Sequence, residues 1–175
     1  MANIELMKRE LHTAVITPLM EQGFSGKWPH FRKVHPDHIV LLTFQTNKYG
    51  GSFTVELSAV FPFSQNKNYS ECDSISLDKL NVWDTNRRYR LRGMYDGWFH
   101  YRNLYGKRTI FSGTDYLSVS EKEAEGFVPP KGYNLIQQFT PETAEKICEC
   151  VNLQLKKGFA WVERFVKKEL RRNSE

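Results

Sequence analysis

The sequence predicts an α+β fold in which an antiparallel β-sheet of about five to six strands, in meander order, is covered on one face by an N-terminal helix and two C-terminal helices. Apolar residues recur at helical spacing near both ends of the chain, whereas residues 28–119 contain short alternating runs separated by turn residues. The chain has 175 residues, of which 40% are apolar, enough for one substantial core. We therefore expect a single domain spanning residues 1–175.

The first element is an amphipathic helix. Its apolar positions follow the spacing of one helix face: Ile4, Met7, Leu11 and Leu19. Gly23 is placed to end this helix, and Pro18 removes one backbone N–H from the last turn. We expect that last turn to be bent or shortened.

Three strands follow the helix. Residues 28–34 and 38–44 are rich in β-branched and aromatic side chains and flank the turn residues His35-Pro36-Asp37, which predicts a hairpin. Apolar and polar side chains alternate strictly in residues 53–59, a pattern typical of a strand with one buried and one exposed face. We therefore expect a half-buried third strand.

The middle of the chain is less regular. Residues 63–74 are polar without periodicity and predict an exposed loop. The pair Asp96-Gly97 separates the runs 89–93 and 98–103, which predicts a second hairpin, and residues 107–119 are expected to add a further strand. The connection at residues 121–131 contains two consecutive prolines and cannot continue regular structure.

The C-terminal region begins with a strong helix start. Thr140 is a capping residue, Pro141 suits the first helical position, and Glu142 complements the positive end of the helix dipole. Gly158 separates two stretches of apolar residues at helical spacing. We therefore expect two C-terminal helices that meet at this glycine.

Composition excludes several classes of protein. No apolar run is long enough to cross a bilayer, and the first residues lack the basic and apolar regions of a secretory signal, so we expect a soluble cytoplasmic protein. The three cysteines, Cys72, Cys148 and Cys150, suit a reducing compartment and are expected as free thiols. We expect no cofactor and no membrane partner, and the sequence leaves the oligomeric state open.

A row of arginines is the most informative candidate site. Arg88, Arg90 and Arg92 stand two residues apart, so on a strand their guanidinium groups would project from one face of the sheet. With nearby aromatic residues they define the predicted binding surface: Arg88, Arg90, Arg92, Trp98, Tyr101 and Arg102. The alternative is that carboxylates on neighbouring strands pair these arginines internally.

Positive charge is concentrated in two segments. Residues 81–108 and residues 156–172 each hold seven basic and two acidic residues, a net charge of +5 apiece, while the whole chain also carries +5. The rest of the chain is therefore acidic on balance. Such a distribution can steer an anionic partner, although a lysine-rich terminal helix is more often a solvated face.

Catalytic patterns are weak. His35 and His38 flank Asp37 but lack a third ligand at metal-binding spacing. A metal-dependent nuclease needs an acidic residue at the end of one strand and, on the next strand, a second acidic residue two positions before a lysine. Residues 45–48 are Gln, Thr, Asn and Lys, so neither Gln45 nor Asn47 supplies that second acid. Cys72 has no histidine near it in the sequence and follows no helix start. An enzyme is therefore not the favoured class.

The first third of the chain resembles the domain-of-unknown-function 4304 family, whose members are small and mostly bacterial. The resemblance is carried by Gly23-Phe24, Phe31-Arg32, Ile39-Val40, residues 44–49 and residues 53–57. None of these residues forms a catalytic motif. The resemblance implies the α+β fold and no particular activity.

These observations favour a non-catalytic binding module that captures an acidic protein partner, as regulatory proteins and immunity-type inhibitors do. The alternative is a nucleic-acid-binding protein or a metal-dependent nuclease. If the arginines serve binding, replacing Arg90 by alanine is expected to weaken partner capture without unfolding the domain.

Overall fold

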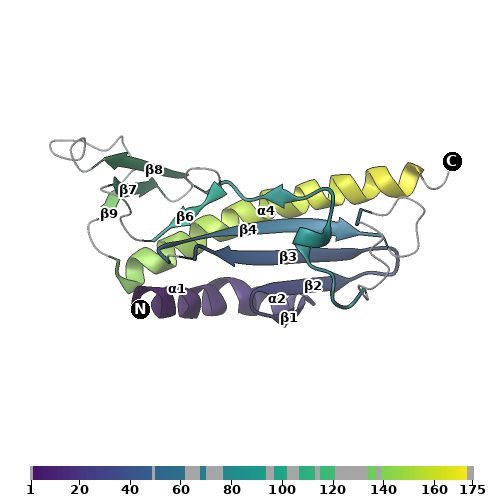
Figure 1. The fold of residues 1–175 in the computed structure, drawn as a ribbon, viewed down its shortest axis with the longest axis horizontal. Helices are drawn as coiled ribbons and strands as arrows, with labels where there is room; N and C mark the ends of the chain where they lie inside the picture. Colours follow the sequence, from purple (N-terminus) through teal and green to yellow (C-terminus); the bar gives the residue numbers. More distant parts are fainter. Residues whose placement is uncertain are drawn as a thin grey trace. The chain divides into compact units, whose positions relative to one another are not determined.

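The computed structural model describes residues 2–48, 50–61, 68–69, 77–93, 97–101, 107–112, 115–120, 134–136 and 139–172. It confirms the α+β class (Figure 1). The helical elements are α1 (Ala2–Leu11), a π-helical turn (His12–Ile16), α2 (Thr17–Glu21), a 3-10 turn (Val82–Asp84) and α4 (Pro141–Arg172). The strands are β1 (Ser25–Lys27), β2 (His30–Val34), β3 (Ile39–Thr46), β4 (Ser52–Val60), β5 (Tyr89–Arg90), β6 (Phe99–His100), β7 (Lys107–Ser112), β8 (Asp115–Ser120) and β9 (Asn134–Ile136).

The strands form two sheets. The larger has six strands in the order β1-β2-β3-β4-β5, with β6 also paired to β4, and the smaller has the order β8-β7-β9. The chain divides into two compact units: the first contains Met1–Leu19, Thr46–Thr54 and Arg92–Gln154, and the second contains Met20–Gln45, Val55–Leu91 and Leu155–Glu175. The prediction of a single domain stays a prediction.

The N-terminal helix is present as expected, with a wide turn where Pro18 disturbs it. The N–H of Thr17 donates to the carbonyl oxygen of His12, five residues back, within the π-helical turn. Pro18 has no N–H and its ring crowds the carbonyl four residues earlier, so a widened turn just before it relieves the conflict. The helix ends at Glu21, and Gly23, whose φ is 93°, closes the turn that follows by donating its N–H to Met20 O at 2.9 Å.

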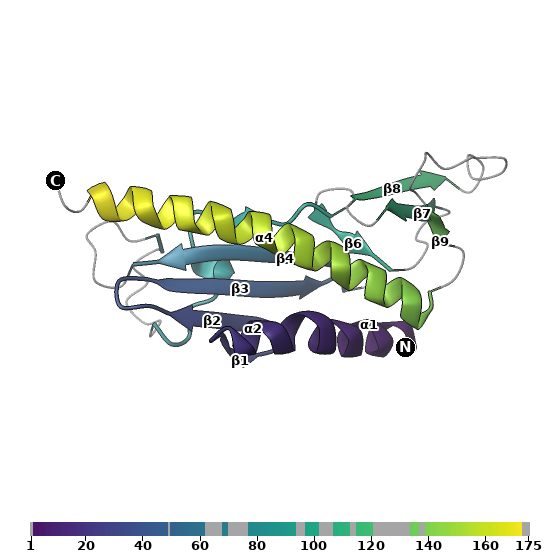
Figure 2. The same cartoon turned by 180° about the vertical axis from the view of Figure 1, so that it is seen from behind.

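Strand β4 differs from the prediction of a half-buried strand, because all nine of its residues are buried. In the second unit, α4 lies against one face of the strand, where Gly158 approaches Leu57 (Figure 2). The chain around the 3-10 turn lies against the opposite face, where Val60 joins Ile39, Leu41, Leu80 and Val82 in one apolar cluster (Figure 1). Alternation alone could not show that both faces are covered.

The hairpin predicted around Asp96-Gly97 is wrong. In the part of this region that the structure describes, β5 and β6 pair with β4, at Glu56–Leu57 and at Ser52–Phe53 respectively, and not with each other. The chain leaves this path at Gly93 and returns at Trp98, and the two residues lie so close that a Cβ on Gly93 would be 2.4 Å from the carbonyl carbon of Trp98. Only glycine fits this crossing.

The C-terminal helix begins as predicted, since the N–H of Thr143 donates to the capping Thr140 Oγ1 at 3.2 Å. The expected break at Gly158 is wrong, because α4 continues for 32 residues. A Cβ at Gly158 would lie 2.9 Å from Leu57 Cδ1 and 3.1 Å from Leu91 Cδ2. The glycine therefore allows close packing of helix on sheet and does not end the helix.

Two other predictions concern less regular regions. The single strand expected within residues 107–119 is a pair, β7 and β8, joined in antiparallel register from Lys107–Ser120 to Ser112–Asp115. Most of the loop predicted at residues 63–74, and all of the connection at residues 121–131, lie outside the described residues.

Candidate functional site

Glu56 lies beneath two of the predicted arginines. Arg90 Nε donates to Glu56 Oε1 at 2.9 Å, and Arg88 Nη1 lies 3.9 Å from Glu56 Oε2. The Glu56 side chain is 3% exposed, whereas those of Arg88 and Arg90 are 45% and 39% exposed. These two arginines are therefore paired internally, as the alternative interpretation of the sequence expects. They cover a buried carboxylate, and part of each guanidinium group remains in solvent.

The remaining predicted residues do not extend this row. Strand β5 contains only Tyr89–Arg90, so the exposed Arg92 lies beyond it. Trp98 is half-buried, and Tyr101, 3% exposed, packs with Phe53 and Phe139 at ring centroid distances of 6.3 and 5.4 Å. Arg102 lies outside the described residues. Arg88 and Arg90 belong to the second unit and the other described members to the first.

Arg87, which the sequence interpretation left out, is held firmly at the start of this run. Asn68 Oδ1 accepts the N–H of Arg87 at 2.9 Å, and Asn68 Nδ2 donates to the Arg87 carbonyl oxygen at 3.0 Å. Ser58 Oγ donates to the same carbonyl at 2.6 Å. These bonds fix the backbone from which the Arg87 side chain extends.

Glu169 on α4 joins the two basic segments. Its Oε1 lies 3.6 Å from Arg87 Nη1 and 3.1 Å from Arg172 Nη1, and its side chain is 8% exposed. The Arg87 guanidinium also lies over the Phe165 ring, 5.9 Å from its centroid. One carboxylate therefore holds a cation from each segment, a contact across 82 residues that no local pattern signals.

We define the basic surface as the exposed cations grouped here in the second unit: Arg87, Arg164, Lys167, Lys168, Arg171 and Arg172. Those on α4 recur at three- and four-residue spacing, so they share one side of the helix. The five on α4 also line a shallow hollow. Only the buried Glu169 is paired with members of this surface among the described residues.

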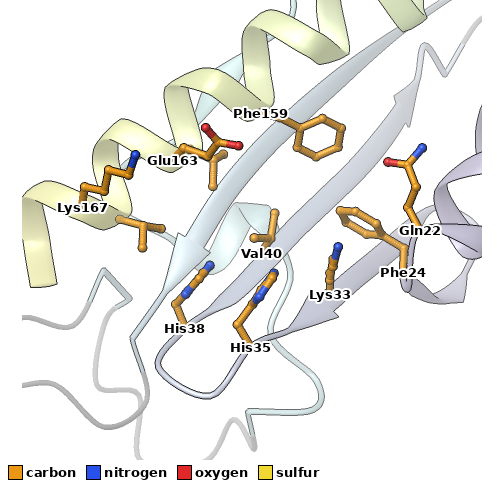
Figure 3. A pocket seen from close by; sticks show the side chains of 11 residues that line it. Gln22, Phe24, Lys33, His35, His38, Val40, Phe159, Glu163 and Lys167 are labelled. Atoms are coloured by element: carbon orange, nitrogen blue, oxygen red, sulfur yellow. The ribbon is translucent and has the colours of Figure 1, made fainter.

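A second feature of the same unit is a pocket of about 430 Å³ between α4 and the β2–β3 turn (Figure 3). We call it the histidine pocket, and its lining residues are Gln22, Phe24, Lys33, His35, His38, Val40, Phe159, Val162, Glu163, Val166 and Lys167. The rings of His35 and His38 stack with centroids 4.4 Å apart and an interplanar angle of 6°. The histidines that the sequence considered for metal binding therefore belong to a largely apolar hollow.

Electrostatics around these histidines favour an uncharged His35. Burial, followed by the charges of His38 and Lys33, lowers the pKa of His35, and Asp37 opposes this only in part. His38 Nδ1 lies 2.6 Å from Asp37 Oδ1, and this hydrogen bond lowers the pKa of Asp37. Among the described residues, no three His, Cys, Asp or Glu side chains are grouped to hold a metal ion.

The described cysteines are poor nucleophiles. Cys148 and Cys150 are both buried on α4. Burial, reinforced by Glu10, raises the pKa of the Cys148 thiol to about 12, so the reactive thiolate is not formed near neutral pH. Cys72 lies outside the described residues.

The described residues define an α+β protein with an N-terminal helix, a six-stranded antiparallel sheet and a long C-terminal helix. The family model described as a domain of unknown function, DUF4304, matches residues 15–110, more than half of the chain, and the chain belongs to this family. No curated protein and no solved structure matches it. In the described ranges, no helix has both the length and the hydropathy needed to cross a membrane.

Proposed function

We propose that this chain is a non-catalytic, cytoplasmic binding module that captures an acidic protein partner on the basic surface. The observation that carries the proposal is the junction at Glu169, where Arg87 and Arg172 bring the two basic segments together. A single buried carboxylate leaves the surface with a large excess of positive charge. This excess attracts carboxylates and accelerates encounter with an acidic partner.

The contacts beneath the basic surface support recognition by fixed side chains. Phe165 stacks on Trp161 with centroids 5.3 Å apart, and Trp161 packs with Tyr89 at 5.6 Å. Arg87 rests on this aromatic layer and is also tied to Glu169. A guanidinium held in place loses less conformational entropy on pairing with a partner's carboxylate than a freely moving one.

A protein partner is favoured over nucleic acid by the charges along α4. Glu163 is exposed one helical turn before Lys167, so a carboxylate lies at the edge of the basic surface. A phosphate backbone would bring a continuous line of negative charge past this carboxylate, whereas a folded acidic protein can place its carboxylates individually. We therefore expect the basic surface to form individual ion pairs with carboxylates of a protein partner.

The test is a pull-down from the native cell with nuclease-treated lysate, comparing the wild-type chain with Lys168→Glu combined with Arg171→Glu. We expect an acidic protein to be retained by the wild type and lost with this charge reversal. Lys156→Glu combined with Lys157→Glu is the matched control, because these exposed lysines lie on α4 outside the basic surface.

Two results would contradict the proposal. The first is capture of the same proteins by the reversed surface and by the wild type. The second is retention that depends on nucleic acid, which a titration with a single-stranded oligonucleotide at two salt concentrations would reveal through steep salt dependence of the affinity. That second outcome would favour the alternative function, in which the basic surface binds nucleic acid.

A further inference from the structure

The histidine pocket combines an apolar interior with a charged rim. Phe24 and Phe159 contact each other across it, with ring centroids 5.7 Å apart. Val40, Val162 and Val166 complete the apolar lining. Figure 3 shows Lys33, His35 and His38 rising from the sheet toward α4, which contributes Glu163 and Lys167 to the rim.

The size of the pocket suits a small organic molecule. Its volume of about 430 Å³ falls within the roughly 300–1,000 Å³ typical of small-molecule sites. Such sites are mostly apolar, with a few polar groups that fix the orientation of the ligand. The histidine pocket has this composition, since its polar groups stand around an aromatic and aliphatic interior.

The rim charges determine which ligand fits. Lys33 and Lys167 are cationic and form no ion pair with any described residue, whereas Glu163 is the only carboxylate among the lining residues. The rim therefore has a net positive charge. Two lysines and one glutamate give a single excess positive charge, which suits a monoanion better than a doubly charged phosphate.

We propose that the histidine pocket binds a small monocarboxylate with an aromatic or aliphatic body. The body packs against Phe24, Phe159 and Val40, and the carboxylate accepts a charge-assisted hydrogen bond from Lys33. Glu163 repels the same group and disfavours dianions. Lys167 lines this pocket and also belongs to the basic surface, but Lys33 and the aromatic interior take no part in that surface, so variants of Lys33 test the ligand site separately from the acidic partner.

The test is calorimetric titration of the full chain with three probes of one shape: 4-phenylbutyrate, 4-phenylbutanol and 4-phenylbutylamine. We expect the carboxylate to bind most tightly, the alcohol less tightly and the amine least. Lys33→Gln should weaken 4-phenylbutyrate binding about tenfold while leaving the alcohol unaffected, because only the carboxylate uses the lysine charge.

Two further variants complete the design. Glu163→Gln should tighten 4-phenylbutyrate binding, because it removes the repelling carboxylate, and Lys157→Gln, an exposed lysine of α4 outside the pocket, should change nothing. Circular dichroism confirms that each variant is folded. The proposal is overturned if folded wild-type protein shows no saturable binding of millimolar 4-phenylbutyrate, if the amine binds best, or if Lys33→Gln leaves the affinity for the carboxylate unchanged.

Discussion

Glu56 illustrates how one residue can alter the meaning of a charge pattern. The sequence presents it as a polar residue on the exposed face of a strand, but the register places it directly opposite Arg90, and both faces of β4 are buried. A buried carboxylate requires a cation or several hydrogen bonds. Arg88 and Arg90 supply them, so these side chains support the fold as well as facing solvent.

This contact changes the expected effect of Arg90→Ala, which the sequence alone predicts to leave the fold intact. The substitution removes the 2.9 Å hydrogen bond to Glu56, so we expect the free energy of unfolding in urea to fall by about 1–3 kcal/mol. Arg92→Ala, at an exposed position outside β5, is the control and should remain within about 0.5 kcal/mol of wild type. Equal stability of the two variants would show that the Glu56 contact has no structural weight.

Two buried serines of β4 form a matched pair for a second prediction. Ser58 Oγ donates to Arg87 O at 2.6 Å and accepts from Asn68 Nδ2 at 3.1 Å, whereas Ser52 Oγ has no hydrogen-bond partner among the described residues. Ser58→Ala should destabilise the fold by about 1–3 kcal/mol, since it leaves buried polar groups unpaired. Ser52→Ala should be neutral or slightly stabilising in the same urea titration. The reverse order would contradict this assignment.

The pocket histidine predicts how stability depends on pH. The pKa of His35 is lowered in the folded state by burial and by the charges of His38 and Lys33, so below the ordinary value of about 6.5 the unfolded chain binds protons more readily. Stability should therefore be fully present above that value and decrease as the pH falls through the lowered pKa. His30, whose pKa is lowered chiefly by burial, acts in the same direction.

Urea unfolding at about pH 7.5 and about pH 5.5 measures this effect, and His35→Gln should reduce the loss of stability between the two conditions. His12→Gln, at an exposed position on the N-terminal helical segment, is the control. A loss of stability identical in His35→Gln and wild type would remove His35 as a source of the pH dependence.

At the scale of secondary-structure elements, α4 shows why a glycine can mislead. In an isolated pattern Gly158 predicts a helix end, yet here it is the point of closest approach between helix and sheet. Helix propensity gives the cost of glycine within a helix, about 1 kcal/mol relative to alanine, but it does not include contacts between the helix and the sheet that packs against it. Packing against Leu57 and Leu91 determines the outcome.

Enlarging this residue should therefore destabilise the fold despite the gain in helix propensity. Gly158→Leu must displace Leu57 and Leu91, both fully buried, and overpacking of this kind costs about 1–3 kcal/mol or more. Gly158→Ala should lie between wild type and Gly158→Leu in thermal melting. A melting temperature of Gly158→Leu above that of wild type would show that the approach is loose.

The elements that sequence reasoning recovered are those specified by local chemistry. The cap at Thr140, the stop at Gly23 and the β2–β3 turn each depend on a few adjacent residues. The hairpin predicted at Asp96-Gly97 was wrong because β4 offers pairing partners to both β5 and β6. Long-range pairing of this kind depends on residues far apart in the chain.

For the candidate site, composition identified the two basic segments but could not bring them together. Glu169 makes that connection, because its partners Arg87 and Arg172 come from segments that are far apart in the sequence. The histidine pocket was missed for the same reason, because its walls come from residues 22–40 and 159–167. The matched family region ends before α4, so the family alone could not indicate either feature.

At the scale of the whole molecule, the two compact units share elements instead of being joined by linkers. The boundary between Thr54 and Val55 lies inside β4, and the boundary between Gln154 and Leu155 lies inside α4. Two further boundaries fall inside α2 and β3, so separating the units would break two strands and two helices. This arrangement favours cooperative unfolding.

We accordingly expect one unfolding transition in urea, with midpoints that coincide by far-ultraviolet circular dichroism and tryptophan fluorescence. Trp28, Trp83 and Trp161 report on the second unit and Trp98 on the first, so a variant with the first three replaced by phenylalanine isolates the first unit. Its fluorescence midpoint should match its own circular dichroism midpoint. Two separated midpoints would show that residues 1–175 do not unfold as the single domain that the sequence predicts.

The crossing of Gly93 and Trp98 also has a practical side. The backbone segments at these two residues lie in close contact, and pairing along the edge of β4 resumes immediately afterwards with β6. A peptide epitope spliced between these two positions would begin and end where the backbone approaches itself closely, so the strand register need not shift to accommodate it. Such a handle would attach the protein to a sensor surface with both α4 and its charged side chains left unmodified.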